Sequence, residues 1–223
     1  FVATLIAAGK LTDEVVREAI DRLDATGHDV GAPHWIDEHD AADIFFQGSL
    51  VSARAELAKM DHGALDVVVQ PFGDRAKKLI VADMDSTMIG CECIDELADY
   101  AGIKDQVAAI TQRAMRGEVD FRGALTERVA LLGGMAEGVL TECRIERVRL
   151  TRGARTLVQT MKAHGAHSVL VTGGFTAFAA PVAEAIGFDK VIANELVIEG
   201  GKLTGTVREP IVDKETKLEA LTS

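Results

Sequence analysis

A short apolar run that ends in two aspartates places the strongest constraint on the fold of this chain. Residues 79–82 have the length and composition of a buried strand, and Asp83 and Asp85 follow this run directly. In a parallel α/β sheet, ligands bind just outside the carboxyl ends of the strands. Two carboxylates at that place are hard to explain by packing, so the stretch predicts a ligand site. A helix N-cap or a turn is the alternative for the aspartate pair taken alone.

The positions of the two aspartates suggest their chemistry. A carboxylate such as Asp83 can attack a phosphoryl group and form an aspartyl-phosphate intermediate. Asp85 can lie beside it, protonate the leaving alcohol oxygen, and later take a proton from the hydrolytic water. Both side chains offer hard oxygen ligands, and Mg²⁺ would relieve the repulsion between their charges. Asp83 and Asp85 are therefore the candidate catalytic pair and also the candidate metal ligands.

The sequence around these aspartates resembles a known family. Residues 83–87, Asp-Met-Asp-Ser-Thr, match the Asp-x-Asp-x-Thr signature of the haloacid-dehalogenase-like phosphatases, and residues 90–98 resemble the phosphoserine phosphatases among them. The resemblance implies an α/β fold, a haloacid-dehalogenase-like Rossmannoid core with a helical cap inserted after the first strand. It also implies a phosphoric monoester hydrolase that uses Mg²⁺ and an aspartyl-phosphate to convert O-phospho-L-serine to L-serine and phosphate, the last step of L-serine biosynthesis.

A second informative stretch follows the apolar run at residues 168–171. Thr172, Gly173 and Gly174 lie between this predicted strand and a helix that starts near Ala177. Such a stretch can offer backbone N–H groups and a side-chain donor to a phosphate, although glycine pairs occur at many turns without a ligand. Placed after the aspartate motif, it is similar to the family's second motif, usually Ser-Gly-Gly-Phe, with Thr172 in the place of serine.

The family's third motif is one lysine that steadies the phosphoryl charge and the aspartate nucleophile. Lys217 is the better match to this lysine by its register before Leu218 and by its distance from Thr172. Lys214 is the rival. For either residue, an ordinary solvated charge on a helix is the alternative interpretation.

A phosphoserine substrate also carries an ammonium and a carboxylate, which a specific site must bind. By resemblance, Glu92 takes the ammonium position and Arg128 the carboxylate position, where a guanidinium fork pairs with both oxygens. Met115 and Phe121 match apolar cap residues that cover the substrate, and Gly173 supplies a backbone contact. The alternatives are surface salt bridges for the two charged residues and core packing for the two apolar ones.

Hydrophobic periodicity divides the chain into an amino-terminal module and a larger α/β region. Residues 1–74 read as strand, helix, strand, strand, helix, strand, which is the order of a ferredoxin-like fold. Some phosphoserine phosphatases carry a regulatory-type domain of this kind, and we expect it to serve packing or dimerisation more often than sensing. The resemblance assigns residues 75–91 and 152–223 to the catalytic core and the helical residues 92–151 to the cap.

Periodicity also predicts individual elements. The strands expected in the amino-terminal module are 2–7, 33–36, 41–46 and 65–70, with helices near 12–27 and 50–60. In the larger region we expect helices near 94–101, 104–116, 120–132, 152–164 and 178–186, strands at 79–82, 168–171 and 190–193, and a hairpin over 195–207.

The family's fourth motif, Gly-Asp-Gly-x-Asn-Asp, supplies a further Mg²⁺ ligand and is absent from this sequence. The sequence stops at Ser223, just inside the helix that carries the lysine, and it begins at Phe1 rather than Met. We therefore expect the C-terminal part of the core and some amino-terminal residues to be missing, and metal binding to be weak. A related small-molecule phosphatase or phosphotransferase and a non-catalytic binding fragment are the alternative functions.

Composition bounds the remaining functions of the 223-residue chain. A net charge of −11 argues against nucleic acid as a main partner, because no basic stripe is available to meet a phosphate backbone. No apolar run is long enough to span a bilayer, so we expect no membrane partner. The three cysteines form no zinc pattern, and free thiols in the cytoplasm are the simpler interpretation. A homodimer through the amino-terminal sheet is a further expectation.

Overall fold

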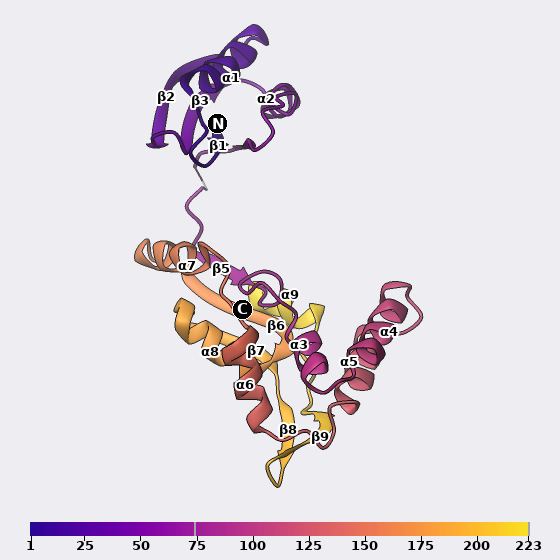
Figure 1. Ribbon diagram of the computed structural model, residues 1–223. Helices are drawn as coiled ribbons and strands as arrows, with labels where there is room; N and C mark the ends of the chain where they lie inside the picture. Colours follow the sequence, from indigo (N-terminus) through magenta and orange to yellow (C-terminus); the bar gives the residue numbers. More distant parts are fainter. Residues whose placement is uncertain (74, 223) are drawn as a thin grey trace. The chain divides into compact units, whose positions relative to one another are not determined.

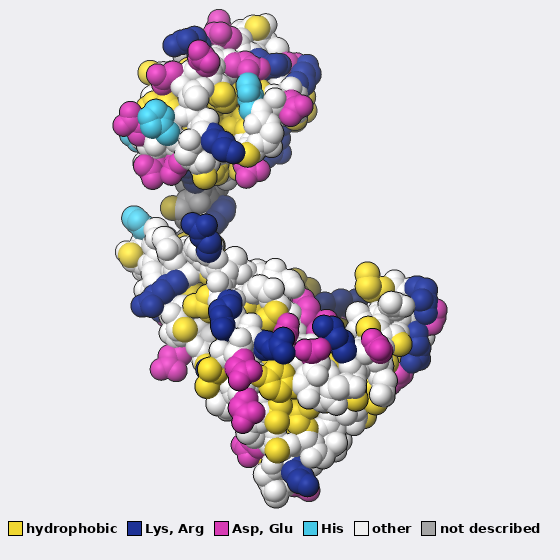
Figure 2. Space-filling model, in the orientation of Figure 1, with side chains coloured by type: hydrophobic (Ala, Val, Ile, Leu, Met, Phe, Trp, Pro, Cys, Tyr) yellow, Lys and Arg dark blue, Asp and Glu magenta, His cyan; other side chains and the backbone are white. Residues whose placement is uncertain are grey.

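The computed structural model describes residues 1–73 and 75–222. The chain divides into two compact units, Phe1–Ala76 and Lys77–Ser223, and each is described by itself. On the face drawn in Figure 2, basic and acidic side chains are interspersed over both units. Within the described ranges we find no helix with the length and apolarity that a membrane crossing needs.

The first unit packs two helices on an antiparallel sheet with the strand order β2-β3-β1-β4. Thr12 starts the first helix because its side chain accepts a hydrogen bond from the backbone N–H of Val15. The order of elements along the unit is that of a ferredoxin-like fold. The elements are β1 (Val2–Ile6), α1 (Asp13–Ala25), β2 (Asp29–Asp37), β3 (Ala41–Gln47), α2 (Leu50–Leu57) and β4 (Asp66–Gln70).

The second unit is built on a parallel sheet with the order β5-β6-β7. Alternate residues of β6 enter different hydrophobic clusters: Leu170 joins the larger one, whereas Val169 and Val171 join a smaller one with Val212. Because both faces are covered by apolar residues, the strands read as continuous apolar runs. The elements are β5 (Leu79–Ala82), α7 (Ala154–Ala163), β6 (His167–Phe175), α8 (Thr176–Ile186), β7 (Lys190–Asn194) and α9 (Lys214–Thr222).

A helical insertion separates β5 from α7. It contains α3 (Cys93–Tyr100), α4 (Lys104–Met115), α5 (Phe121–Ala130) and α6 (Gly138–Arg147). In Figure 1, α4 and α5 lie side by side, away from the parallel sheet, and α6 contacts α8. The chain segments that enter and leave the insertion are bonded to each other: the N–H of Gly90 donates to the carbonyl of Arg149 at 3.1 Å, and the N–H of Thr151 to that of Met88 at 3.0 Å. The insertion is therefore attached through a short paired segment next to the end of β5.

A hairpin of β8 (Leu196–Glu199) and β9 (Lys202–Val207) supports this insertion. The backbone at Gly205, which has a φ of 84°, comes close to α5, because a Cβ there would lie 3.1 Å from the carbonyl oxygen of Ala130. The N–H of Leu203 also donates to the carbonyl of Met135 at 2.9 Å. The carboxyl end of α5 is thus fixed to the hairpin, whereas its amino end faces the sheet.

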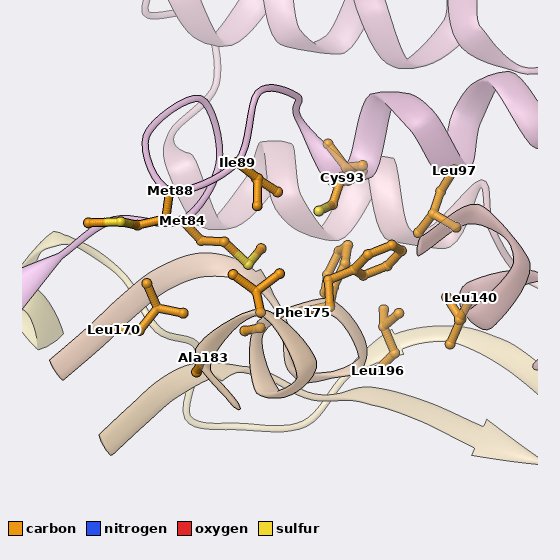
Figure 3. Packing of buried hydrophobic residues seen from close by; sticks show 14 of the residues in the cluster. Met84, Met88, Ile89, Cys93, Leu97, Leu140, Leu170, Phe175, Ala183 and Leu196 are labelled. Carbon is orange, nitrogen blue, oxygen red and sulfur yellow. The ribbon is translucent and has the colours of Figure 1, made fainter. Parts of the chain in front are cut away.

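The loop after β5 is held in place by apolar packing. Figure 3 shows the side chains of Met84 and Ile89 lying against Leu170 and Phe175 of β6, with Ala183 of α8 close by. Met84 and Ile89 are fully buried and Phe175 is nearly so. This packing fixes the direction in which the chain leaves the strand.

Three elements differ from the sequence predictions. The strand predicted at 168–171 does not end there: β6 continues to Phe175, because this residue is buried and pairs with Asn194 after a register shift. The strand predicted at 33–36 is part of the longer β2. No separate helix was expected at Gly138–Arg147, where Glu137 makes no side-chain cap that could signal a helix start.

Candidate active site

The two aspartates that follow β5 open onto one cavity. Met84 lies between them and is fully buried. Asp83 and Asp85 on either side of it are only partly buried, and both line the cavity. The cavity has a volume of about 200 Å³ and is lined by Asp83, Asp85, Glu92, Ile94, Phe121, Leu125, Arg128, Thr172, Gly173, Gly174, Phe175 and Lys217.

Asp83 is bonded through both carboxylate oxygens. Its Oδ1 accepts a hydrogen bond from the N–H of Met84 at 2.8 Å, and its Oδ2 accepts one from Nζ of Lys217 at 2.7 Å. Both side chains of the ion pair are partly exposed, so its contribution to stability is small. Its effect is to place a positive charge beside the carboxylate. Lys214 does not line this cavity; it lines a neighbouring cavity of about 540 Å³, which Lys217 lines as well.

Asp85 is more enclosed than Asp83. Its Oδ1 accepts a hydrogen bond at 3.1 Å from the N–H of Cys93, the first residue of α3. Burial raises the pKa of Asp85, the hydrogen bonds from Cys93 oppose this, and the nearby charges of Glu92 and Asp83 raise the pKa further. The protonated form is therefore more accessible than in an ordinary aspartate, which suits a proton donor.

The end of β6 contributes a hydroxyl and two close glycines. Thr172 is 1% exposed, and its Oγ1 accepts a hydrogen bond from the N–H of Gly174 at 2.9 Å. An accepting hydroxyl keeps its own proton to donate to a ligand. A Cβ at Gly174 would lie 2.7 Å from Oδ2 of Asp85, and one at Gly173 would lie 2.9 Å from Cζ of Phe121. Only glycine fits at these two positions without a shift of its neighbours.

Residues of the insertion close the other side of the cavity. Glu92 accepts a hydrogen bond from Oγ of Ser86 at 2.7 Å, and Arg128 donates through Nε to the carbonyl of Ala124 in its own helix at 3.1 Å. Burial lowers the pKa of Arg128, and the charges of Asp95 and Glu92 oppose this effect. Phe121 is 45% exposed at the start of α5.

Met115 is the one predicted site residue that lies outside this group. Its side chain is 84% exposed at the end of α4, and it is not among the residues that line the cavity. The other predicted residues, from both aspartates to Lys217, share the cavity.

Asn194 does not line the cavity, but it bonds to Gly173, which does, and sequence reasoning missed it. It ends β7 and is 1% exposed. Its Nδ2 donates to the carbonyl of Gly173 at 2.8 Å, and its Oδ1 accepts from the N–H of Val212 at 2.8 Å. The available signal was a polar residue directly after an apolar strand, the same signal that identified Asp83.

The residues on the cavity can supply only part of the coordination shell of a Mg²⁺ ion. In the part of the chain that the structure describes, no group of three or more His, Cys, Asp or Glu residues could hold a metal. Asp83 and Asp85 nevertheless offer hard oxygens on one cavity. Mg²⁺ commonly takes one or two carboxylates and completes its shell with phosphate oxygens and water, so these two residues fit that role.

Comparisons with known proteins agree with this geometry. A family model described as haloacid dehalogenase-like hydrolase matches residues 80–223. A phosphoserine phosphatase of Archaeoglobus fulgidus is 47% identical over 155 residues, which make up 69% of this chain and 45% of that protein. The chain thus spans about half the length of this curated relative.

Two solved structures extend the comparison. A probable phosphoserine phosphatase from Vibrio cholerae, in unliganded form, has a TM-score of 0.77 at 33% identity and covers 99% of this chain and 67% of its own. A phospho-aspartyl intermediate analogue of phosphoserine phosphatase has a TM-score of 0.60 at 36% identity and covers 66% of this chain and 69% of its own. The α/β fold class predicted from the sequence is confirmed by these matches.

Proposed function

The chain belongs to the haloacid dehalogenase-like hydrolase family, and from this premise we propose that it hydrolyses O-phospho-L-serine to L-serine and phosphate. The relative from Archaeoglobus fulgidus, which is named a phosphoserine phosphatase, supports this substrate. The observation that carries the proposal is one cavity in which the Asp83–Lys217 pair meets Asp85, Glu92 and Arg128.

The reaction proceeds in two displacements at phosphorus. A carboxylate oxygen of Asp83 attacks the phosphoryl group, the bond from phosphorus to the serine oxygen breaks, and that oxygen takes a proton from Asp85. Water then gives a proton to Asp85 and attacks the same phosphorus, which breaks the aspartyl-phosphate bond and releases phosphate. The raised pKa of Asp85 supports its role in both proton transfers.

The phosphoryl oxygens are held by groups from two elements of the core. The Thr172 hydroxyl donates from β6, the backbone at Gly173 adds a contact, and the Lys217 ammonium neutralises charge from α9. The Asp83 carboxylate and the backbone carbonyl of Asp85 would hold Mg²⁺, which would supply further charge neutralisation at the phosphoryl group. Lys217, which already bonds Asp83 at 2.7 Å, also restrains the nucleophile.

The insertion provides the contacts that select the alcohol half. Arg128 pairs with the substrate carboxylate and Glu92 with its ammonium, because both charged side chains line the same cavity as Thr172. Phe121, which lines the cavity, covers the bound substrate. Met115 lies outside the cavity and would join it only if the cap closed further. Closure of this kind excludes water from the phosphoryl transfer.

The proposal also includes the organisation of the chain. Residues 75–91 and 152–223 form the catalytic core, residues 92–151 the cap, and residues 1–74 a regulatory-type domain. The edge position of β2 in the first sheet supports a homodimer, which light scattering can test. The free thiols of Cys91, Cys93 and Cys143 fit a cytoplasmic location.

A substrate comparison tests the function. Phosphate release is measured with O-phospho-L-serine and with p-nitrophenyl phosphate, which has neither ammonium nor carboxylate, each with and without Mg²⁺. A version extended beyond residue 223 through a Gly-Asp-Gly-x-Asn-Asp segment is assayed in parallel, to test the expectation that this motif is needed. We expect Mg²⁺-dependent phosphate release from phosphoserine, with greater release by the extended version. Turnover of p-nitrophenyl phosphate alone would favour a related small-molecule phosphatase or phosphotransferase instead.

A further inference from the structure

A buried asparagine connects the two core segments that carry Thr172 and Lys217, the proposed phosphate-binding residues. Asn194 donates from Nδ2 to the carbonyl oxygen of Gly173 and accepts at Oδ1 from the N–H of Val212, both at 2.8 Å. Its Nδ2 also lies 3.5 Å from the carbonyl oxygen of Val212. One side chain of β7 therefore joins the end of β6 to the segment directly before α9.

The first of these bonds fixes a peptide plane. The carbonyl of Gly173 and the N–H of Gly174 belong to the same peptide unit. The carbonyl is held by Asn194, and the N–H donates to Oγ1 of Thr172 at 2.9 Å. If the plane turned, Thr172 would lose the donor that orients its hydroxyl toward a ligand.

The second bond fixes the start of α9. Val212 is buried against Val169 and Val171 of β6, and its N–H is held by Asn194. Asp213 follows and accepts hydrogen bonds at Oδ1 from the N–H groups at the beginning of α9. Lys217 lies in the next turn of this helix and reaches Asp83 at 2.7 Å. The position of Val212 therefore determines where the lysine ammonium lies.

A second buried polar residue of the same sheet provides a contrast. Ser168 is fully buried near the amino end of β6, and its Oγ donates to Oδ2 of Asp189 at 2.8 Å. These partners lie at the opposite end of the strand from the cavity. Both residues satisfy buried polar groups, but only Asn194 bonds to the segments that carry Thr172 and Lys217.

We propose that Asn194 is a positioning residue for phosphoryl transfer, which sets the Thr172 hydroxyl and the Lys217 ammonium in register with Asp83. This inference rests on the proposed function, because it assumes that Thr172, Lys217 and Asp83 act together on a phosphoryl group. Asn194 acts through the backbone at Gly173 and Val212 and touches no substrate. Its loss should therefore weaken contacts to the phosphate half and leave discrimination of the alcohol half unchanged.

The test compares Asn194→Ala with the control Ser168→Ala in the full chain. Calorimetric titration with inorganic phosphate in the presence of Mg²⁺ gives a readout that needs no turnover. Phosphate release from O-phospho-L-serine and from p-nitrophenyl phosphate gives kcat and KM. We expect Asn194→Ala to lower phosphate affinity and both values of kcat/KM by about tenfold or more, by the same factor for both substrates. Ser168→Ala should lower the melting temperature and leave these quantities within about twofold.

Several outcomes would overturn the proposal. One is a folded Asn194→Ala chain with unchanged phosphate affinity. Another is a Ser168→Ala chain that loses as much phosphate affinity and kcat/KM as Asn194→Ala does. If Asn194→Ala does not fold, Asn194→Leu is used, because its branched side chain has a similar shape, makes no hydrogen bonds and adds no charge. Unchanged phosphate affinity in that variant would also overturn the proposal. The unaltered chain could also release no phosphate from phosphoserine, while Asn194→Ala still weakens phosphate binding and p-nitrophenyl phosphate turnover. That result would count against the proposed substrate and support the positioning role.

Discussion

The two sides of the cavity differ in how their polar groups are bonded before any substrate arrives. On the core side, the bonds join distant parts of the sequence: Lys217 and Asp83 are 134 residues apart, and Asn194 and Gly173 are 21 apart. On the cap side, the bonds are local: Arg128 donates four residues back in its own helix, and Glu92 accepts from a hydroxyl six residues away. The core-side groups are therefore held by contacts between distant parts of the fold, whereas Arg128 and Glu92 are held by partners close to them in the sequence.

This difference corresponds to two tasks of the site, the stabilisation of charge and the selection of the substrate. Groups that stabilise developing charge in a transition state are most effective when their positions are fixed in advance. Groups that select a substrate can instead exchange local partners for the ligand when the cap closes. We therefore expect changes on the core side to affect every phosphomonoester and changes on the cap side to affect phosphoserine selectively.

The largest expected effect is that of Asp83→Asn. The amide cannot act as the nucleophile, so kcat should fall by at least about a thousandfold for phosphoserine and for p-nitrophenyl phosphate alike. Asp105→Asn, an exposed change in the first turn of α4, is the matched control and should have no effect on phosphate release. Substantial residual turnover in Asp83→Asn would mean that Asp83 is not the nucleophile, and the comparison between the two sides of the cavity would no longer hold.

The next effect distinguishes the two lysines of α9. Lys217→Ala removes the ammonium that bonds Asp83, and we expect kcat to fall by about a hundredfold, because charge stabilisation at the phosphoryl group is lost. Lys214→Ala removes a lysine of the same helix that lies on the neighbouring cavity and should change kcat by less than about twofold. The reverse ranking in steady-state assays would assign the family's third motif to Lys214.

The same contrast explains what the sequence could predict. Asp83 and Asp85 follow an apolar strand, and in a parallel sheet such positions converge, so the fold class and the core-side residues could be inferred from local patterns. Lys217 needed the family resemblance, because a single lysine on a helix carries no signal of its own. Asn194 carried the signal of a polar residue at the end of an apolar strand, but its role could not be inferred, since its two partners, Gly173 and Val212, become neighbours only in the folded chain.

Arg128→Ala examines the cap side and should have a smaller, selective effect. Loss of hydrogen bonds to a charged group weakens binding by about ten- to a hundredfold, so KM for phosphoserine should rise by that factor. p-Nitrophenyl phosphate lacks the carboxylate, and its kcat/KM should stay unchanged. Arg116→Ala is the control, because Arg116 pairs with Glu118 on the surface of the same insertion. Equal losses for both substrates would mean that Arg128 acts on the phosphoryl group and that the two tasks are not separated.

Met115→Ala is the smallest expected effect and the most direct test of cap movement. Because Met115 is 84% exposed and lies outside the cavity, its truncation should change KM for phosphoserine by less than about twofold. The family resemblance predicts instead that this residue covers the substrate. A clear rise in KM for phosphoserine would show that α4 carries Met115 onto the bound ligand, because only movement of the insertion brings an exposed side chain into the site.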